Sequence, residues 1–405
     1  MSKPFSYGKI LAIGSGFFAI SVVWMVYNTF MPLILSQFIE GASWRGAIMG
    51  LDNLLAMLLI PVIGTWSDRT NTKYGQRLPF IAVGMPLAAL LFFTLPNMQG
   101  SMWTLLAVDI LFLLAMTVVR GPVIALMPDY TPPEKRSTAN GLINLMGGIG
   151  SLIALFAVAK TYDANQAYPF AIAGSLMLLC FFLLFFVVDR KPAFAASVLE
   201  ESDEVAARRS LGSGLKQLFA KENRSRLLVL IAIFFYFIGY AGVEAQFSTY
   251  ATESLGLTGG QAGTTLGFFS LSFVLFALPA GLVGSKLGKM RTMTFGLVLL
   301  PVVFLIVPFL HSMWTLRIVL LLGGIGWALI NVQAYPLVAG FGGKTQIGFF
   351  TGMYYLFSML SQSLAPFLLG VVMDTVSQPA MFYAASASMF IALLLLRQGA
   401  KGVRE

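Results

Sequence analysis

Twelve apolar stretches, each roughly 20 residues long, limit what this chain can fold into. A run of that length is what one α-helix needs to cross the hydrocarbon core of a bilayer. Backbone groups in that core must hydrogen-bond within the segment, which favours helices. The stretches lie at roughly residues 10–35, 44–66, 80–98, 103–127, 138–160, 167–189, 227–250, 260–284, 292–310, 313–340, 347–373 and 379–397. The sequence therefore predicts an all-α, polytopic membrane protein with twelve transmembrane helices.

Composition supports this class and argues against others. Hydrophobic residues make up 58% of the 405 residues and charged residues only 11%, which is outside the range of soluble domains. The net charge of +9 does not require nucleic acid, because Lys and Arg gathered in alternate loops also orient membrane proteins. The single Cys180 and the lone His311 leave no ligand set for a metal. We therefore expect a bilayer around a functional monomer, no metal and no nucleic-acid partner.

The twelve stretches divide into six and six around a polar segment. Residues 190–226 carry an acidic cluster and then Arg208 and Arg209, and they are interpreted as a cytoplasmic linker between bundles at 1–189 and 227–405. With both termini inside, the inner loops receive most Lys and Arg residues, and the outer loops little more than Arg45 and Lys160. This bias predicts cytoplasmic N- and C-termini in the inner (plasma) membrane of the cell.

The two halves also resemble each other. Residues 64–69 (GTWSDR) match residues 281–286 (GLVGSK), and each run closes the second stretch of its half. Pro128 matches Pro336 at the exit of the fourth stretch. A duplicated six-helix unit is typical of carriers that rock two halves around a site at the membrane midplane. Matches this short also arise by chance in apolar sequence.

The segment after the second stretch carries a signature. Residues 61–79 (PVIGTWSDRTNTKYGQRLP) resemble the loop between helices two and three of the major facilitator superfamily. The long spacing to Gly75 and Pro79 is similar to that in the glycoside-pentoside-hexuronide carriers and the sucrose-transporter-like carriers of bacteria. Residues 121–129 (GPVIALMPD) resemble the exit of helix four in the sucrose carriers. The resemblance implies two six-helix bundles and sugar transport by alternating access.

The chain also departs from these carriers. Asp109 and Arg120 stand four residues earlier than the helix-four charges of plant-type sucrose carriers, which keeps them on the same helix face one turn away. Melibiose-type sodium carriers have an acidic residue where Arg120 stands, and two carboxylates where this chain has Ala56 and Ile60. Proton coupling is therefore favoured over sodium, and we expect no other cofactor.

Asp109, Asp52 and Glu244 are the candidate proton carriers, because each carboxylate lies in an apolar stretch. Such a group can take a proton on one side of the membrane and release it on the other. Asp109 is favoured, since helices one, four, seven and ten line the cavity in the family that the chain resembles. Asp52, followed by Asn53, could instead join helices at the outer seam, and Glu244 could instead form an ion pair of an outer gate.

Arg120 is the leading candidate for contact with substrate. An arginine at the bilayer centre costs about 2.5–3.5 kcal/mol on insertion scales, so it is expected to face a cavity. Its forked donors suit the neighbouring hydroxyls of a sugar, although they could instead tie helices together through backbone carbonyls. Aromatic and polar side chains on other stretches complete the predicted site, and each is also explained by contacts between packed helices. These are Tyr27, Asn28, Tyr240, Glu244, Gln246, Asn331, Gln333, Tyr354 and Gln362.

The predicted inner gate consists of glycines and charges near the cytoplasmic helix ends. By resemblance, Asp68 faces the start of helix eleven near residues 342–344, where a carboxylate gains roughly 0.3–1 kcal/mol from the helix dipole. Positive-inside anchoring explains the arginines of the gate but not its aspartates. The set is Gly64, Asp68, Arg69, Gly75, Arg77, Asp129 and Arg136.

These features predict a secondary transporter rather than an enzyme. The glycine run at 147–150 has no Lys-Ser/Thr partner, so we expect no ATP site. The first hypothesis is a proton-coupled symporter for a di- or oligosaccharide or a glycoside. The 35 Phe and 20 Met residues keep open a facilitator or exporter of another small, drug- or lipid-like solute. A non-transporting receptor on the same fold would be favoured if the charged cavity residues proved dispensable.

Overall fold

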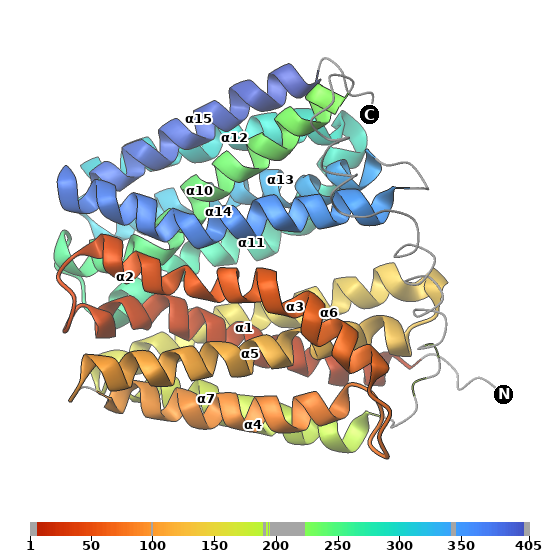
Figure 1. Ribbon diagram of the computed structural model, residues 1–405. Coiled ribbons are helices and arrows are strands. Elements are labelled where there is room, and N and C mark those ends of the chain that lie inside the picture. The colour runs from red at the N-terminus through yellow and green to blue at the C-terminus, as the bar shows by residue number, and fades with distance from the viewer. Residues whose placement is uncertain are drawn as a thin grey trace. The chain divides into compact units, whose positions relative to one another are not determined.

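The computed structural model of this chain describes residues 6–98, 100–188, 192, 194, 223–341 and 346–400. Twelve helical spans are long and apolar enough to cross a membrane, and no β-strand occurs among these described residues (Figure 1). The predicted all-α architecture with twelve transmembrane helices is confirmed. Most of the predicted linker at 190–226, and residues 342–344 near which Asp68 was expected, lie outside the described residues.

The spans keep close to their predicted limits, because apolar length decides where a helix can leave the membrane. The N-terminal half contains α1 (Tyr7–Leu35), α2 (Ala42–Met49), α3 (Leu51–Arg69), α4 (Leu78–Thr94), α5 (Met102–Tyr130), α6 (Arg136–Ile153) and α7 (Tyr168–Val187). The C-terminal half contains α10 (Arg224–Glu253), α11 (Gly259–Leu287), α12 (Lys289–Ile306), α13 (Met313–Gly340), α14 (Ile347–Thr375) and α15 (Ala380–Ala400). Short 3-10 or π segments are η1 (Leu95–Asn97), η2 (Pro133–Lys135), η3 (Ala154–Val158), η4 (Ala159–Asp163) and η6 (Val307–Phe309).

The described residues form two compact units. The first contains those within Met1–Ile34 and Leu55–Ala207, and the second contains those within Leu35–Leu54 and Arg208–Glu405. The second membrane span is therefore shared, because its first part packs with the C-terminal half of the chain. The predicted division at 190–226 assigns that part to the N-terminal bundle, and the division itself stays a prediction.

The second span, predicted over 44–66, consists of two helices that continue each other through Gly50, which keeps helical dihedral angles (φ −76°, ψ −13°) and donates its N–H to Gly46 O at 2.9 Å. α2 ends at Met49 and α3 begins at Leu51. A Cβ atom at Gly50 would lie 2.0 Å from the backbone oxygen of Ser363, and one at Gly46 would lie 2.1 Å from that of Pro366. α2 therefore lies backbone to backbone against α14 (Figure 1), at a separation that only glycine allows.

An aromatic cluster around Phe112 of α5 fills the interior of the first unit. Its ring centroid lies 5.0 Å from that of Phe92 on α4 and 5.5 Å from that of Tyr27 on α1. The ring centroid of Trp24, on the same helix as Tyr27, lies 6.1 Å from that of Phe112. Because residues three apart share a helix face, this cluster also fixes the orientation of Asp109 toward the interior.

The internal repeat extends beyond the matches recognised in the sequence. Residues 101–105 and 312–316 both read SMWTL and begin α5 and α13. Trp103 and Trp314 stand in the first turn of these helices with 77% and 63% of their surfaces exposed, as expected for interfacial tryptophans. Gly75 and Gly288, just before α4 and α12, share a φ of 89°. The duplication of the six-helix unit is therefore visible in backbone conformation as well as in sequence.

Candidate functional site

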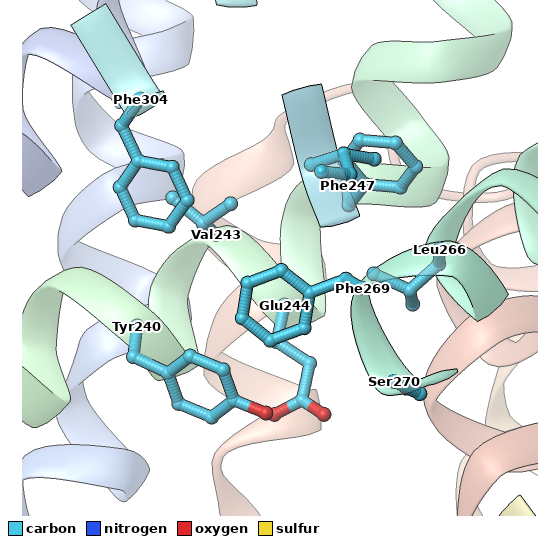
Figure 2. A pocket seen from close by; sticks show the side chains of 9 residues that line it. Tyr240, Val243, Glu244, Phe247, Leu266, Phe269, Ser270 and Phe304 are labelled. Atoms are coloured by element: carbon cyan, nitrogen blue, oxygen red, sulfur yellow. The ribbon is translucent and has the colours of Figure 1, made fainter. Parts of the chain in front are cut away.

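A small cavity in the second unit holds one of the predicted proton carriers. Its volume is about 20 Å³, enough for a water molecule but far too small for a disaccharide. Four elements line it through Tyr240, Val243, Glu244 and Phe247 of α10, Leu266, Phe269 and Ser270 of α11, Phe304 of α12 and Leu320 of α13. Figure 2 shows the Glu244 carboxylate as the acidic group among these side chains.

Glu244 is held by an aromatic partner on its own helix. The Tyr240 hydroxyl and the Glu244 carboxylate form a hydrogen bond, and Figure 2 shows the two groups pointing at each other. The Tyr240 ring stacks on Trp327 of α13, with 3.6 Å between centroids and 9° between planes. One side chain thus connects the carboxylate to a flat aromatic pair. Trp327 was missed in the sequence, since a stacking partner on another helix leaves no local signal.

Asp52 lies within electrostatic range of Glu244. It is the second residue of α3, and its Oδ1 accepts a hydrogen bond of 2.7 Å from Asn53 Nδ2. The second unit therefore brings two of the three predicted proton carriers together, although 192 positions separate residues 52 and 244 in the chain.

The start of α2 is bound to α10 and α14 by charged groups, an arrangement that we call the α2 seam. Arg45 is 2% exposed, and its Nη1 lies 2.9 Å from Glu253 Oε1. Asp374 accepts hydrogen bonds from the backbone N–H groups of Ala42 and Ser43 at 2.8 and 2.9 Å, and so caps the helix. Arg45 was expected among the few charges of the outer loops. Burial against an acidic partner explains why it stands in a region otherwise poor in arginine.

Three amides predicted to contact substrate donate to backbone carbonyls in this conformation, and their roles in substrate binding stay predictions. Gln246 Nε2 donates to the oxygens of Ala42 and Pro366, each at 2.9 Å, and so belongs to the α2 seam. Gln333 Nε2 donates to Ala280 at 2.8 Å, and Gln362 Nε2 donates to Ser358 at 3.1 Å. These contacts match the alternative in which the amides join packed helices or bond within one helix.

Asp109 and Arg120 lie on α5 in the first unit. Asp109 is fully buried, one turn from Phe112 on the same face. Arg120 is half-buried and has no hydrogen bond, ion pair or ring contact with any described residue. The eleven residues between them place their Cα atoms about 16 Å apart along the axis, so they do not pair with each other.

The remaining predicted contact residues are spread over both units. Tyr27 is buried in the Phe112 cluster, and Asn28 beside it is half-buried. Asn331 is half-buried on α13, and Tyr354 is buried on α14 with its ring edge-to-face with Tyr335, 5.6 Å between centroids. These positions leave the predicted roles of the four residues as predictions.

The core of the predicted gate forms around Arg77 in the first unit. Arg77 is 5% exposed, its Nε lies 3.0 Å from Asp129 Oδ2, and it also pairs with Asp68. Its Nη1 donates to Ser67 Oγ at 2.6 Å, a partner not singled out in the sequence. Arg136 is close enough to act on Asp129 electrostatically. Two aspartates therefore share one buried guanidinium, which we call the Arg77 cluster.

The glycines of the gate differ in their roles. Gly75 has a φ of 89°, a conformation that disfavours side chains, in the turn where its N–H donates to Thr72 O at 2.9 Å. This turn returns the chain so that Arg77 meets the end of α3. A Cβ atom at Gly64 would contact nothing within 4 Å, and Arg69 is exposed with no ion pair to a described residue. Neither residue belongs to the Arg77 cluster.

Known proteins resemble this chain over most of its length. The isoprimeverose transporter of Lactiplantibacillus pentosus is 25% identical over 70% of this chain and 60% of its own. The class E tetracycline resistance protein of Escherichia coli is 24% identical over 66% of this chain and 64% of its own. The chain thus spans less than two thirds of the length of either relative.

Fold and family agree with the resemblance seen in the sequence. The crystal structure of a point mutant of the nucleoside transporter NupG superposes with a TM-score of 0.76 at 13% identity, over 98% of this chain and 100% of that one, which shows the fold alone. The sequence profile of the Major Facilitator Superfamily matches residues 13–257 and, overlapping them, residues 229–403. This multi-pass membrane protein belongs to the Major Facilitator Superfamily.

Proposed function

We propose that the chain is a secondary active transporter that moves a sugar together with a proton by alternating access. The substrate class is a di- or oligosaccharide or a glycoside, in line with the relative named as an isoprimeverose transporter. The observation that carries the proposal is Glu244, a carboxylate inside a membrane span that hydrogen-bonds Tyr240 beside a water-sized cavity. An ionised carboxylate inside a membrane span costs free energy, so its presence there indicates a functional site.

The available side chains suit a sugar. Sugar rings present C–H faces to aromatic side chains and hydroxyls to polar groups, and the second unit supplies aromatic side chains in Tyr240 and Trp327, which in this conformation are stacked on each other with Trp327 buried. Arg120 provides five N–H donors that no described residue occupies. The proton and the sugar therefore have different groups to bind to, which a coupled carrier requires.

The surrounding topology follows from the loop charges. We propose that both termini are cytoplasmic, because this orientation keeps most loop Lys and Arg residues on the inner side of the plasma membrane. We also propose that the chain works as a monomer. The Arg77 cluster then lies at the cytoplasmic end of the first unit, and the α2 seam lies at the outer end of the second.

A second candidate function is export of an amphipathic, drug-like solute. The similarity to the class E tetracycline resistance protein favours it, as do the many Phe and Met side chains. The two functions differ in the substrate and in the direction of net movement.

Uptake into proteoliposomes tests the proposal. We expect one labelled sugar of a panel of di-, oligosaccharides and glycosides to accumulate under an inward proton gradient. At 100 mV a single proton supplies about 2.3 kcal/mol, which corresponds to roughly fifty-fold accumulation. A protonophore should abolish it. Equilibration without accumulation would indicate a facilitator, and proton-driven efflux of tetracycline or another drug-like probe would support the exporter.

The lysine and alanine variants of Arg120 test its role in substrate binding. We expect Arg120→Lys to lose transport almost as fully as Arg120→Ala, because an ammonium group cannot make two parallel hydrogen bonds to neighbouring hydroxyls. Initial uptake rates and sugar affinity should both fall by a factor of about ten or more, at about 1.4 kcal/mol per tenfold. Full activity of the lysine variant would show that the forked donors of Arg120 are not used in substrate binding.

A further inference from the structure

Glu244 differs from the other predicted proton carriers in the partners that surround it. Its carboxylate accepts from the Tyr240 hydroxyl, lines a cavity large enough for one water molecule, and has Asp52 as a charged neighbour. Water gives a proton a route to the carboxylate, and the hydroxyl provides a group whose bonding changes when the proton arrives. Within the described part of the chain, no cation lies close enough to Glu244 to neutralise it.

The charged and titratable groups of the neighbouring helices are engaged elsewhere. On α13, Arg317 donates to the hydroxyls of Thr264 and Thr265 on α11, at 3.3 and 3.2 Å. Glu253, nine residues further along α10, pairs with Arg45 of α2. Between Arg226 and Glu253, the other titratable groups on α10 are tyrosines, Tyr236, Tyr240 and Tyr250, and α14 carries Tyr354, Tyr355 and Asp374, of which Asp374 caps α2. Apolar side chains and Ser270 complete the cavity wall on α11, α12 and α13. Asp52 is therefore the acidic group that acts on Glu244.

Asp52 lies close to a boundary between the two units. It stands in the first turn of α3, three residues before Leu55, where the same span passes from the second unit to the first. On the other side of Gly50, the α2 seam ties α2 to α14 through Asp374 and Gly46. A change of charge at Asp52 therefore acts at the point where a fixed segment meets one that belongs to the other unit.

We propose that Glu244 and Asp52 share the coupling proton. When the proton binds, the hydrogen bond between Glu244 and Tyr240 changes, and the Tyr240 ring shifts against the stacked ring of Trp327. This inference rests on the proposed symport and assigns its coupling site. One proton from the solution on one side of the membrane adds to one carboxylate oxygen, and the formal charge of the pair changes from minus two to minus one. Release to water on the opposite side restores it. Loss of the repulsion between the two carboxylates lets the first turn of α3 approach α10, which biases the alternation.

The test compares Glu244→Gln with the matched variant Glu244→Asp. Glutamine keeps the shape and the hydrogen bond to Tyr240 but cannot titrate, whereas aspartate keeps a titratable group. We assign Glu244 to the proton rather than to the sugar, so Glu244→Gln should still exchange labelled sugar in counterflow, and loss of that exchange would place Glu244 in sugar binding and overturn the assignment. Net accumulation by Glu244→Gln should fall from tens of fold to one. Glu244→Asp should still accumulate sugar and respond to pH, and Asp52→Asn should reduce accumulation without abolishing counterflow.

A second measurement does not depend on transport. Because Tyr240 stacks on Trp327, titration of Glu244 should change the tryptophan fluorescence of detergent-purified protein with pH. We expect this change in wild type, and its loss in both Glu244→Gln and Trp327→Phe. An identical titration in Glu244→Gln would overturn the proposal.

The transport measurements distinguish a wrong assignment of the coupling proton from a failure of the proposed symport. If Asp109→Asn abolishes accumulation while Glu244→Gln retains it, the coupling proton sits on Asp109 and our assignment is wrong. If wild type accumulates no sugar under any gradient, the proposed symport fails. The fluorescence titration then still decides whether Glu244 binds a proton in the folded protein.

Discussion

Arg77→Ala should lower the free energy of unfolding of the purified protein by about 3–5 kcal/mol, the usual effect of removing one partner from a buried ion pair. The reason is the geometry of the Arg77 cluster. Without the guanidinium, the carboxylate of Asp129 stays fully buried with its main counter-charge missing, and Asp68 and Ser67 lose their shared partner. Denaturant unfolding in detergent, followed by circular dichroism, measures the loss.

Two further variants identify its cause. Adding Asp129→Asn to Arg77→Ala should restore at least half of the lost free energy, because the buried charge is removed together with its partner. Arg291→Ala removes an exposed arginine in the first turn of α12, and it should change the free energy by less than about 1 kcal/mol. If Arg77→Ala behaves like Arg291→Ala, the cluster is hydrated and contributes no more than a surface ion pair.

Gly50→Ala should open the α2 seam. The added methyl group would lie 2.0 Å from the backbone oxygen of Ser363, and a backbone atom cannot turn aside as a side chain can. α2 must move away from α14, which lengthens the bonds from Asp374 to Ala42 and Ser43. Overpacking of this kind costs about 1–3 kcal/mol, which shifts a conformational equilibrium roughly five- to 150-fold.

Cysteine labelling measures that shift. The variant Ala42→Cys, in a Cys180→Ser background, places a thiol at a buried position, and it should react slowly with a water-soluble maleimide. Its labelling rate should rise by about tenfold or more when Gly50→Ala is added. Gly352→Ala, on α14 itself, is the matched control, because a Cβ atom there meets nothing within 4 Å. Equal labelling in the two glycine variants would mean that α2 and α14 separate freely without the substitution.

The sequence predicted those parts of the structure that depend on local information. The twelve spans follow from apolar length, and the Arg77 cluster follows in part from a local motif, since Asp68 and Arg77 belong to one loop. Gly64 and Arg69, in the same motif, lie outside the cluster, because motif membership does not fix which side chains meet in one conformation. The repeat was recognised from weak matches, while the identical runs at 101–105 and 312–316 were overlooked.

The parts that were not predicted depend on contacts across the chain. Arg45 and Glu253 are 208 positions apart, and nothing near either residue indicates the other. The proximity of Asp52 to Glu244 and the stacking of Trp327 on Tyr240 are of the same kind. Each requires knowledge of which helices are neighbours and of their rotation about their axes. A pattern in a single sequence does not contain this information.

The shared second span has a consequence for biosynthesis. Its first part enters the membrane early in translation, yet the carboxylate that caps it at Ala42 belongs to Asp374, 332 residues later in the chain. Until α10 supplies Glu253 for the buried arginine and α14 supplies Asp374 for the bare amide groups, both have to be accommodated by lipid headgroups, water or the insertion machinery. The N-terminal half of this protein therefore does not finish folding when its own synthesis ends. The second membrane span therefore completes its contacts only after α14 is inserted. Chains truncated before residue 374 should be recognised by membrane quality control as incompletely folded in both the second span and the C-terminal half.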